Sequence, residues 1–118
     1  MEWKTIPTFP KYEASEDGDI RRKSTGQILK PYTDKKQEYP RVSCYGEKGD
    51  RHKRMVHTLV ASAFFGPKPE GMEIDHINTN RFDCSVANLR YVTPEENRNN
   101  PITLLKRKMR KMGMPMLF

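Results

Sequence analysis

Hydrophobic and polar positions follow different patterns on the two sides of residue 55. In the first 45 residues, short runs of mixed polarity lie between turn signals such as Asp17-Gly18 and Thr25-Gly26. This spacing is typical of a small antiparallel sheet. We predict strands over residues 11–15, 19–22, 27–30 and 40–45. The expected buried contacts are Trp3, Ile6, Tyr12, Ile20 and Leu29.

Helical patterns appear in the second half of the chain. Apolar side chains between Met55 and Phe64 recur at spacings that line one face of a helix, which should end at Gly66-Pro67. The segment Thr93-Pro94-Glu95-Glu96 has the residues of a capping box with proline at the first helical position, so a second helix should start there. Asn100-Pro101 predicts the start of a third helix, which is basic and amphipathic.

Two strands are expected between the first and second helices. Residues 72–74 predict a short strand that runs into Asp75-His76, and residues 88–92 predict a strand that returns beside it. The stretch over residues 77–87 has no regular period. The second half of the chain therefore predicts a strand, an irregular loop, a returning strand and a capped helix.

Composition limits the class of protein. The chain has 118 residues, 35% hydrophobic and 31% charged, so it fits one modest core and not two large domains. No run approaches the ~18 apolar residues of a membrane-spanning helix, and the N-terminus lacks the layout of a signal peptide. Cys44 and Cys84 are far apart without a CxxC motif, which favours free thiols. We expect a soluble intracellular protein without a membrane partner.

Basic residues are unevenly distributed along the chain. The 22 Lys and Arg exceed the 15 Asp and Glu by seven. The segment charges are −3 for residues 1–20, +7 for 21–56, −3 for 57–97 and +6 for 98–118. Two basic stretches around a mildly acidic centre fit a phosphate-binding surface around a cation-dependent site, while ordinary solubilising charge gives the same net value.

Asp75, His76, Asn88 and Asn97 fall on the predicted strands and capped helix where they can converge. Cleavage of a phosphodiester needs a general base and a divalent cation. Histidine suits the base because its ordinary pKa of about 6.5 leaves most of it neutral at pH 7. Carboxylate and amide oxygens suit Mg²⁺ or Mn²⁺ and do not suit zinc. Because consecutive strand residues face opposite sides, the chain should bend or end near Asp75-His76.

Both halves of the chain resemble known sequence families. From Arg54 to Asn100, which includes the segment IDHINTNRFDCSVANLRYVTPEEN, the chain resembles HNH endonucleases of the phage and intron-encoded homing type. Upstream, the residues WKxI and then YExSxxGxIR resemble the small nuclease-associated (NUMOD-type) module that often precedes such domains. Two features depart from the family pattern: the last letter of H-N-H is asparagine, and the loop INTNRFDCSV replaces an Asp-Gly-Asn form common in relatives.

The resemblance implies a role for each polar residue of the motif. His76 would be the general base, Asp75 and Asn97 would supply oxygen ligands to Mg²⁺ or Mn²⁺, and Asn88 would brace the loop so that His76 faces the phosphate. Asn88 can do so because its amide both donates and accepts. For His57, on the first predicted helix, we expect packing and not catalysis, and for His52 we expect a solvated loop.

Nine basic residues are candidates for contact with nucleic acid. For Arg81 and Arg90, inside the motif, clamping of a phosphate and plain solvation are equally compatible with the sequence. The tail cluster around Lys106 could be a DNA-binding helix, an unstructured extension or a surface for a membrane or partner. The candidates are Arg21, Arg22, Lys23, Arg54, Arg81, Arg90, Lys106, Arg107 and Arg110.

The sequence therefore predicts an α+β fold in three parts. A β-rich module over residues 1–50 precedes a ββα-metal (His-Me finger) nuclease domain over 51–100 and a basic tail over 101–118. The expected activity is metal-dependent hydrolysis of double-stranded DNA, as a nick if the protein is a monomer, in the cytoplasm of a bacterial or phage-infected cell. A DNA-binding protein that no longer cuts and a nuclease that acts on RNA are the alternatives.

Overall fold

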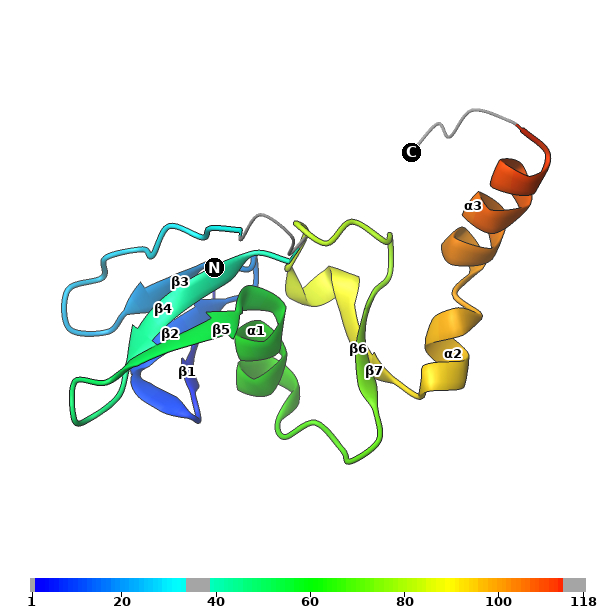
Figure 1. Ribbon diagram of the computed structural model, residues 1–118. Helices are drawn as coiled ribbons and strands as arrows, with labels where there is room; N and C mark the ends of the chain where they lie inside the picture. Colours follow the sequence, from blue (N-terminus) through cyan, green and yellow to red (C-terminus); the bar gives the residue numbers. More distant parts are fainter. Residues whose placement is uncertain (1, 34–38, 114–118) are drawn as a thin grey trace.

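A computed structural model describes residues 2–33 and 39–113, and the protein has the expected α+β fold (Figure 1). The five N-terminal strands lie on one side of helix α1, and a two-stranded hairpin with two further helices lies on the other. The elements are β1 (Trp3–Ile6), β2 (Phe9–Ser15), β3 (Ile20–Arg22), β4 (Arg41–Tyr45), β5 (Arg51–Met55), α1 (Val56–Phe65), β6 (Glu73–His76), the 3₁₀ turn η1 (Val86–Asn88), β7 (Leu89–Val92), α2 (Pro94–Arg98) and α3 (Pro101–Lys111).

The N-terminal strands form a three-stranded antiparallel sheet, β1-β2-β3, and a β4–β5 hairpin. Two details differ from the sequence prediction. Residues 27–30 are not a strand, because Ile28 makes only a single bridge to Arg21. Residues 51–55 were not predicted as a strand, because their sequence RHKRM is charged, but they pair along their whole length with β4. His52 therefore lies on a strand, against Phe9 and bonded to Asp50, and the prediction of a solvated loop was wrong.

Helix α1 begins and ends where its apolar pattern predicts. It runs from Val56 to Phe65 and is followed by Gly66, whose φ of 83° is easily adopted only by glycine. The helix packs on β1, β2 and β5 and also on β6 and β7. One continuous core results, which contains Ile6, Phe9, Tyr12, Ala14, Ile20, Val42, Cys44, Val56, Leu59, Val60, Cys84 and Leu89.

The N-terminal sheet and the second half of the chain also touch through their backbones. The amide of Val86 donates to the carbonyl of Glu16 at 2.8 Å. A Cβ at Gly18 would lie 2.8 Å from the backbone of Cys84, and the φ of Gly18 is 95°. Only glycine fits at this contact. The division at residues 50 and 51 stays a prediction, and it falls inside the β4–β5 hairpin.

The β6–β7 hairpin and the capped helix α2 follow in the predicted order. Asp75 pairs with Arg90 and His76 with Leu89, so the strand continues through His76 and the chain turns directly after it. Thr93 and Glu96 form both hydrogen bonds of the capping box. Helix α3 extends over the predicted basic tail as far as Lys111 and projects away from the body (Figure 1). The last five residues of that tail, 114–118, lie outside the described part.

Other expectations concern cysteines and membranes. Cys44 and Cys84 are both buried and free, as the sequence predicts. Within residues 2–33 and 39–113, no helix has the length and apolar character needed to cross a membrane.

Candidate active site

Strand β6 distributes its side chains to two sides. Because side chains alternate along a strand, Glu73 and Asp75 share one face and His76 lies on the other. The contacts agree with this alternation: Asp75 and Glu73 bond to residues of α2 and its C-terminal flank, while the ring of His76 packs on His57 of α1.

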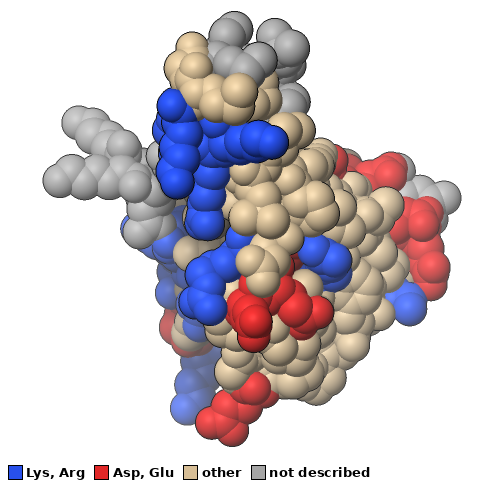
Figure 2. Space-filling view, turned by 90° about the vertical axis from the view of Figure 1, so that its right-hand side faces the viewer, with Lys and Arg blue, Asp and Glu red and all other residues tan. Residues whose placement is uncertain are grey.

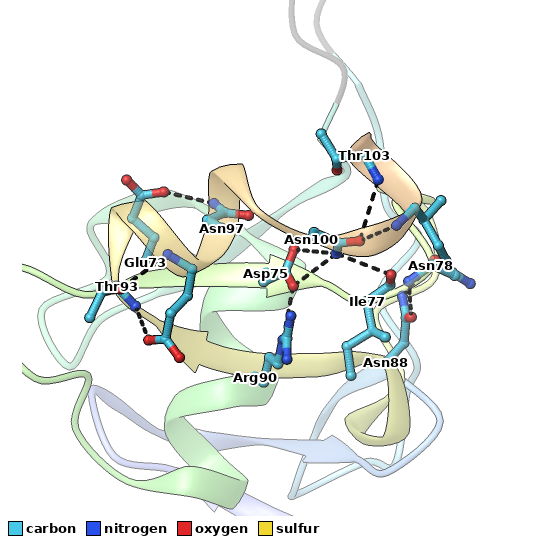
Figure 3. A network of polar contacts seen from close by, with 12 residues as sticks. Glu73, Asp75, Ile77, Asn78, Asn88, Arg90, Thr93, Asn97, Asn100 and Thr103 are labelled. Carbon is cyan, nitrogen blue, oxygen red and sulfur yellow. Dashed lines mark hydrogen bonds and ion pairs between the residues drawn. The ribbon is translucent and has the colours of Figure 1, made fainter. Parts of the chain in front are cut away.

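The Asp75 carboxylate is buried and held by two donors (Figure 3). Nε of Arg90, directly opposite on β7, donates to Oδ2 at 2.9 Å. Nδ2 of Asn100 donates to both carboxylate oxygens, at 3.0 and 3.2 Å. A buried carboxylate is stable only with such partners, so these two residues fix its orientation.

His76 lies in a cluster of three aromatic rings. Its ring centroid is 4.9 Å from that of His57, edge to face, and 5.8 Å from that of Tyr39. Its Nε2 is buried and has no hydrogen-bond partner among the described residues. Burial lowers the pKa of His76, and the negative charges of Asp75 and Asp83 partly oppose that change. The imidazole is therefore neutral at pH 7 and able to accept a proton.

His57 is the buried neighbour of His76. Burial, with a smaller effect of His76, lowers the pKa of His57 to about 4. Its Nδ1 is buried without a hydrogen-bond partner in the part of the chain that the structure describes. The expectation that His57 is packed agrees with this position, which is in contact with the proposed base.

Asn88 holds the loop that follows His76 (Figure 3). Its Oδ1 accepts from the backbone amide of Asn78, and its Nδ2 donates to Oδ1 of Asn78 and to the carbonyl of Asp83, each at 2.9 Å. Its own carbonyl accepts from the amide of Ile77. One buried amide thus ties together both ends of the loop, which is the arrangement expected of a brace.

The loop itself contains a strained residue. Thr79 has a φ of 63°, a left-handed conformation that β-branched residues rarely adopt. It occupies the centre of Asn78-Thr79-Asn80, in the loop that follows His76. The bonds that Asn88 makes across the loop keep the chain in this conformation despite the strain.

Asn97 lies on α2, and its Nδ2 donates to Oε2 of Glu73 at 2.7 Å. This contact leaves the Oδ1 oxygen of Asn97 as the atom that can coordinate a cation. The Asp75 carboxylate and the Asn97 amide both offer oxygen atoms, the donor type that suits a hard cation such as Mg²⁺ or Mn²⁺, and their sharing of one cation stays a prediction. Among the residues described, no group of three or more His, Cys, Asp and Glu side chains could hold a metal ion.

The predicted nucleic-acid residues on and beside strands β3 and β5 have different surroundings. Arg21 is engaged inside the module, because it pairs with Glu13 at 2.7 Å and stacks on Trp3. Arg22 and Lys23 line a groove of about 770 Å³ that also contains Lys11 and Tyr45. Arg54 is exposed on β5 and lies over the Phe9 ring. Arg22, Lys23 and Arg54 are thus better placed for phosphate contact than Arg21.

Four of the other five basic candidates lie around the site. Arg81 is in the loop, over the Tyr39 ring, and Arg90 is paired with Asp75. Nζ of Lys106 donates to Oγ1 of Thr79 at 2.5 Å, and Arg107 shares a hollow with Glu73 and Asn97. On this face, Lys and Arg side chains form a band that runs down one edge, beside a smaller acidic group (Figure 2). Arg110 is exposed on α3.

Three contacts of the site were not expected from the sequence. Asn100, predicted only as a helix cap, lies on Asp75, and Glu73 lies on Asn97. Tyr39 packs on both histidines. The period-two spacing of Glu73 and Asp75 was a usable signal for Glu73. The contacts of Asn100 and Tyr39 join distant parts of the chain, so local pattern carries no sign of them.

The ββα-metal class of nuclease domains has this order of elements. A strand ends in Asp-His, a braced loop and a returning strand follow it, and a capped helix carries asparagine. Comparison with known families agrees: the HNH endonuclease family matches residues 54–99, and the NUMOD4 motif matches residues 1–45. The chain therefore contains an HNH endonuclease domain preceded by a NUMOD4 motif, and the resemblance predicted for both halves of the sequence is confirmed.

Individual relatives come from viruses and phages. The chain is 33% identical to the DNA endonuclease I-HmuI of Bacillus phage SP01 over 105 residues, which are 87% of this chain and 59% of that protein. It is 34% identical to an HNH endonuclease of Acanthamoeba polyphaga mimivirus, over 89% of this chain and 28% of the relative. It is 30% identical to the H-N-H endonuclease F-TflII of Escherichia phage T5, over 81% of this chain and 50% of the relative.

The fold also matches a solved structure of the HNH homing endonuclease I-HmuI, from work on DNA binding and cleavage by that enzyme. The TM-score is 0.73 at 31% identity, and the match covers 95% of this chain and 66% of the other. This chain thus spans between about a quarter and three fifths of the curated relatives described here, so they contain regions that have no counterpart in it.

Proposed function

We propose that this chain is a metal-dependent endonuclease that hydrolyses phosphodiester bonds of double-stranded DNA and nicks one strand. The observation that supports this most strongly is the arrangement of β6, β7 and α2. It places a buried neutral imidazole and a fixed carboxylate on consecutive residues, directly before a braced turn.

Each residue of the motif has a distinct role in this proposal. His76 takes a proton from the attacking water, and burial favours this role because it keeps the ring neutral at pH 7. Asp75 and Asn97 would hold a divalent cation, and that cation would supply positive charge to the phosphate and to the leaving 3′ oxygen. Asn88 keeps the turn after His76 in one conformation, so that the imidazole keeps its direction.

The basic surface positions the substrate. Exposed lysines and arginines of α3 and β5 contact phosphates and set the position of the duplex without reading its sequence. Arg90 holds Asp75 through Nε and is 43% exposed at its side chain, so the rest of its guanidinium can reach a phosphate. The proposed substrate agrees with the phage relatives, and so does the proposed place of action, the cytoplasm of a bacterial or phage-infected cell.

Conversion of supercoiled plasmid to the open-circular form tests the proposal. The wild-type protein should nick plasmid with Mg²⁺ or Mn²⁺ and should stop when EDTA is added. His76→Ala should remove the activity. His52→Ala is the control, because it removes a histidine that lies outside the site, and it should retain the activity. Persistent nicking by His76→Ala would exclude His76 as the base.

The same assay separates the alternatives. Tight, salt-sensitive DNA binding without nicking in any divalent cation would favour a binding protein on a nuclease scaffold. Competition between RNA and duplex DNA would identify a nuclease that prefers RNA.

A further inference from the structure

Both the oxygen and the nitrogen of the Asn100 side-chain amide make hydrogen bonds. The residue is 1% exposed and lies between α2 and α3. Its Oδ1 accepts from the amides of Ile102 and Thr103, at 2.9 and 3.4 Å, and so caps α3. Its Nδ2 donates to the Asp75 carboxylate, and also to the carbonyl of Ile77 at 3.2 Å. The residue that caps the basic helix therefore also donates hydrogen bonds to the Asp75 carboxylate.

The two partners of Asp75 act on it in different ways. Arg90 brings a full positive charge and is partly exposed, whereas Asn100 is neutral and buried. A neutral donor fixes the direction of a carboxylate without cancelling its charge, so the oxygens stay attractive to a cation. Groups that orient a metal ligand in this way commonly change metal affinity or activity about 10- to 100-fold when they are removed.

A second contact joins α3 to the same region. Lys106, in the second turn of the helix, donates to the hydroxyl of Thr79 in the loop after β6. The amide of Asn100 reaches the carbonyl of Ile77 in that loop. Helix α3 is thus attached at two points to the segment that carries the proposed base and carboxylate.

We propose that Asn100 is a positioning residue that ties the start of the basic helix α3 to the Asp75 carboxylate and aims that carboxylate at the cation. This inference rests on the proposed nuclease function. It adds a residue outside the Asp-His-Asn-Asn motif and gives α3 a part in the geometry of the site as well as in DNA contact.

Substitutions at residue 100 distinguish this role from simple helix capping. Serine, aspartate and asparagine all cap helices well, whereas alanine does not. Asn100→Ser keeps the cap but is too short to reach Asp75. Asn100→Asp keeps both the cap and the shape of the side chain, and it replaces the donor with an oxygen that repels the carboxylate. Asn100→Ala removes both functions.

Two measurements on the full chain test the role. The first is the rate of plasmid nicking at saturating DNA, as a function of Mg²⁺ concentration. The second needs no turnover: binding of Mn²⁺ to the protein with a mixed-sequence duplex, followed by electron paramagnetic resonance and corrected for Mn²⁺ bound by the duplex alone. Helix content and the melting temperature, measured by circular dichroism, show whether each variant is folded.

The expected pattern is specific. Asn100→Ser and Asn100→Asp should keep the helix content of the wild type, bind Mn²⁺ at least about 10-fold more weakly and nick at least about 10-fold more slowly, with little change in DNA affinity. Wild-type Mn²⁺ binding and nicking in both folded variants would overturn the inference, since capping alone would then explain Asn100. A wild-type protein that never nicks, but binds Mn²⁺ more tightly than Asn100→Ser, would refute the proposed function while it supports the role of Asn100.

Discussion

The buried pair of histidines should make the fold sensitive to mild acid, and the size of the effect follows from the pKa of His57. That pKa is about 4 in the folded chain and 6.5 for an ordinary histidine, so the unfolded state binds more protons between these values. The free energy of unfolding therefore falls as the pH falls through this window. From pH 7 to pH 5, His57 alone should remove about 2 kcal/mol.

Urea unfolding followed by circular dichroism at pH 7, 6 and 5 measures this loss. His57→Phe keeps a ring in the same place but cannot take up a proton, so its free energy of unfolding should fall by about 2 kcal/mol less than that of the wild type over the same interval. The comparison uses the difference between two pH values for each variant. A general loss of stability from the substitution therefore does not affect it.

His76 provides a second test of the same reasoning, because burial lowers its pKa in the same direction. His76→Phe should reduce the acid sensitivity as well, and the double variant should be the least sensitive. The reasoning would be refuted if His57→Phe lost as much stability as the wild type between pH 7 and pH 5. That result would mean that His57 is protonated in the folded state or open to water.

Four further outcomes are expected. Gly18→Ala should lower the free energy of unfolding by about 2–4 kcal/mol in urea titrations, since a Cβ meets backbone there at a positive φ; a change below about 0.5 kcal/mol would contradict that contact. Thr79→Gly should be about 1 kcal/mol more stable than Thr79→Ala in the same titrations, since neither variant has the hydroxyl that accepts from Lys106 and only glycine relieves the positive φ; equal stabilities would mean that the loop is unstrained. Arg90→Met should lower the melting temperature through the buried Asp75 charge, by a loss of about 1–3 kcal/mol, and Mg²⁺ should restore more stability in this variant than in the wild type. Deletion of residues 101–118 should flatten the salt dependence of DNA affinity by a log–log slope of about 0.9 for each lost phosphate contact, and an unchanged slope would mean that this segment does not touch DNA.

Elements with a strong local signal could be predicted from the sequence. Helix α1 has an apolar face and a glycine stop, and α2 has a complete capping box, so both begin where the pattern indicates. Strand β5 has no such signal, because Arg51–Met55 is charged and only pairing with β4 makes it a strand. Residues 27–30 contain two apolar side chains, but they make only one bridge to β3, at Ile28, so the same reasoning failed there in the opposite direction.

Contacts in the candidate site also differ in whether the sequence could predict them. Asp75, His76 and Asn88 are close in sequence and form one hairpin, so their order alone indicated that they lie together. The contact between Asn100 and Asp75 spans 25 positions and depends on the direction in which α3 leaves α2. When a residue already has a recognised local role, such as capping a helix, the sequence pattern gives no sign of a second role.

The alternation of side chains along β6 explains why the turn after it is so strongly constrained. Asp75 and His76 face opposite sides of the strand, and the proposed mechanism, in which both act on one phosphate, therefore requires the strand to stop at this point. The chain turns immediately after His76, and the amide of Thr79 bonds back to the His76 carbonyl at 2.7 Å. The hydrogen bonds that Asn88 makes with this loop offset the strain at Thr79. Loss of the Asn88 side chain should therefore affect the base and the carboxylate together, although it bonds to neither of them.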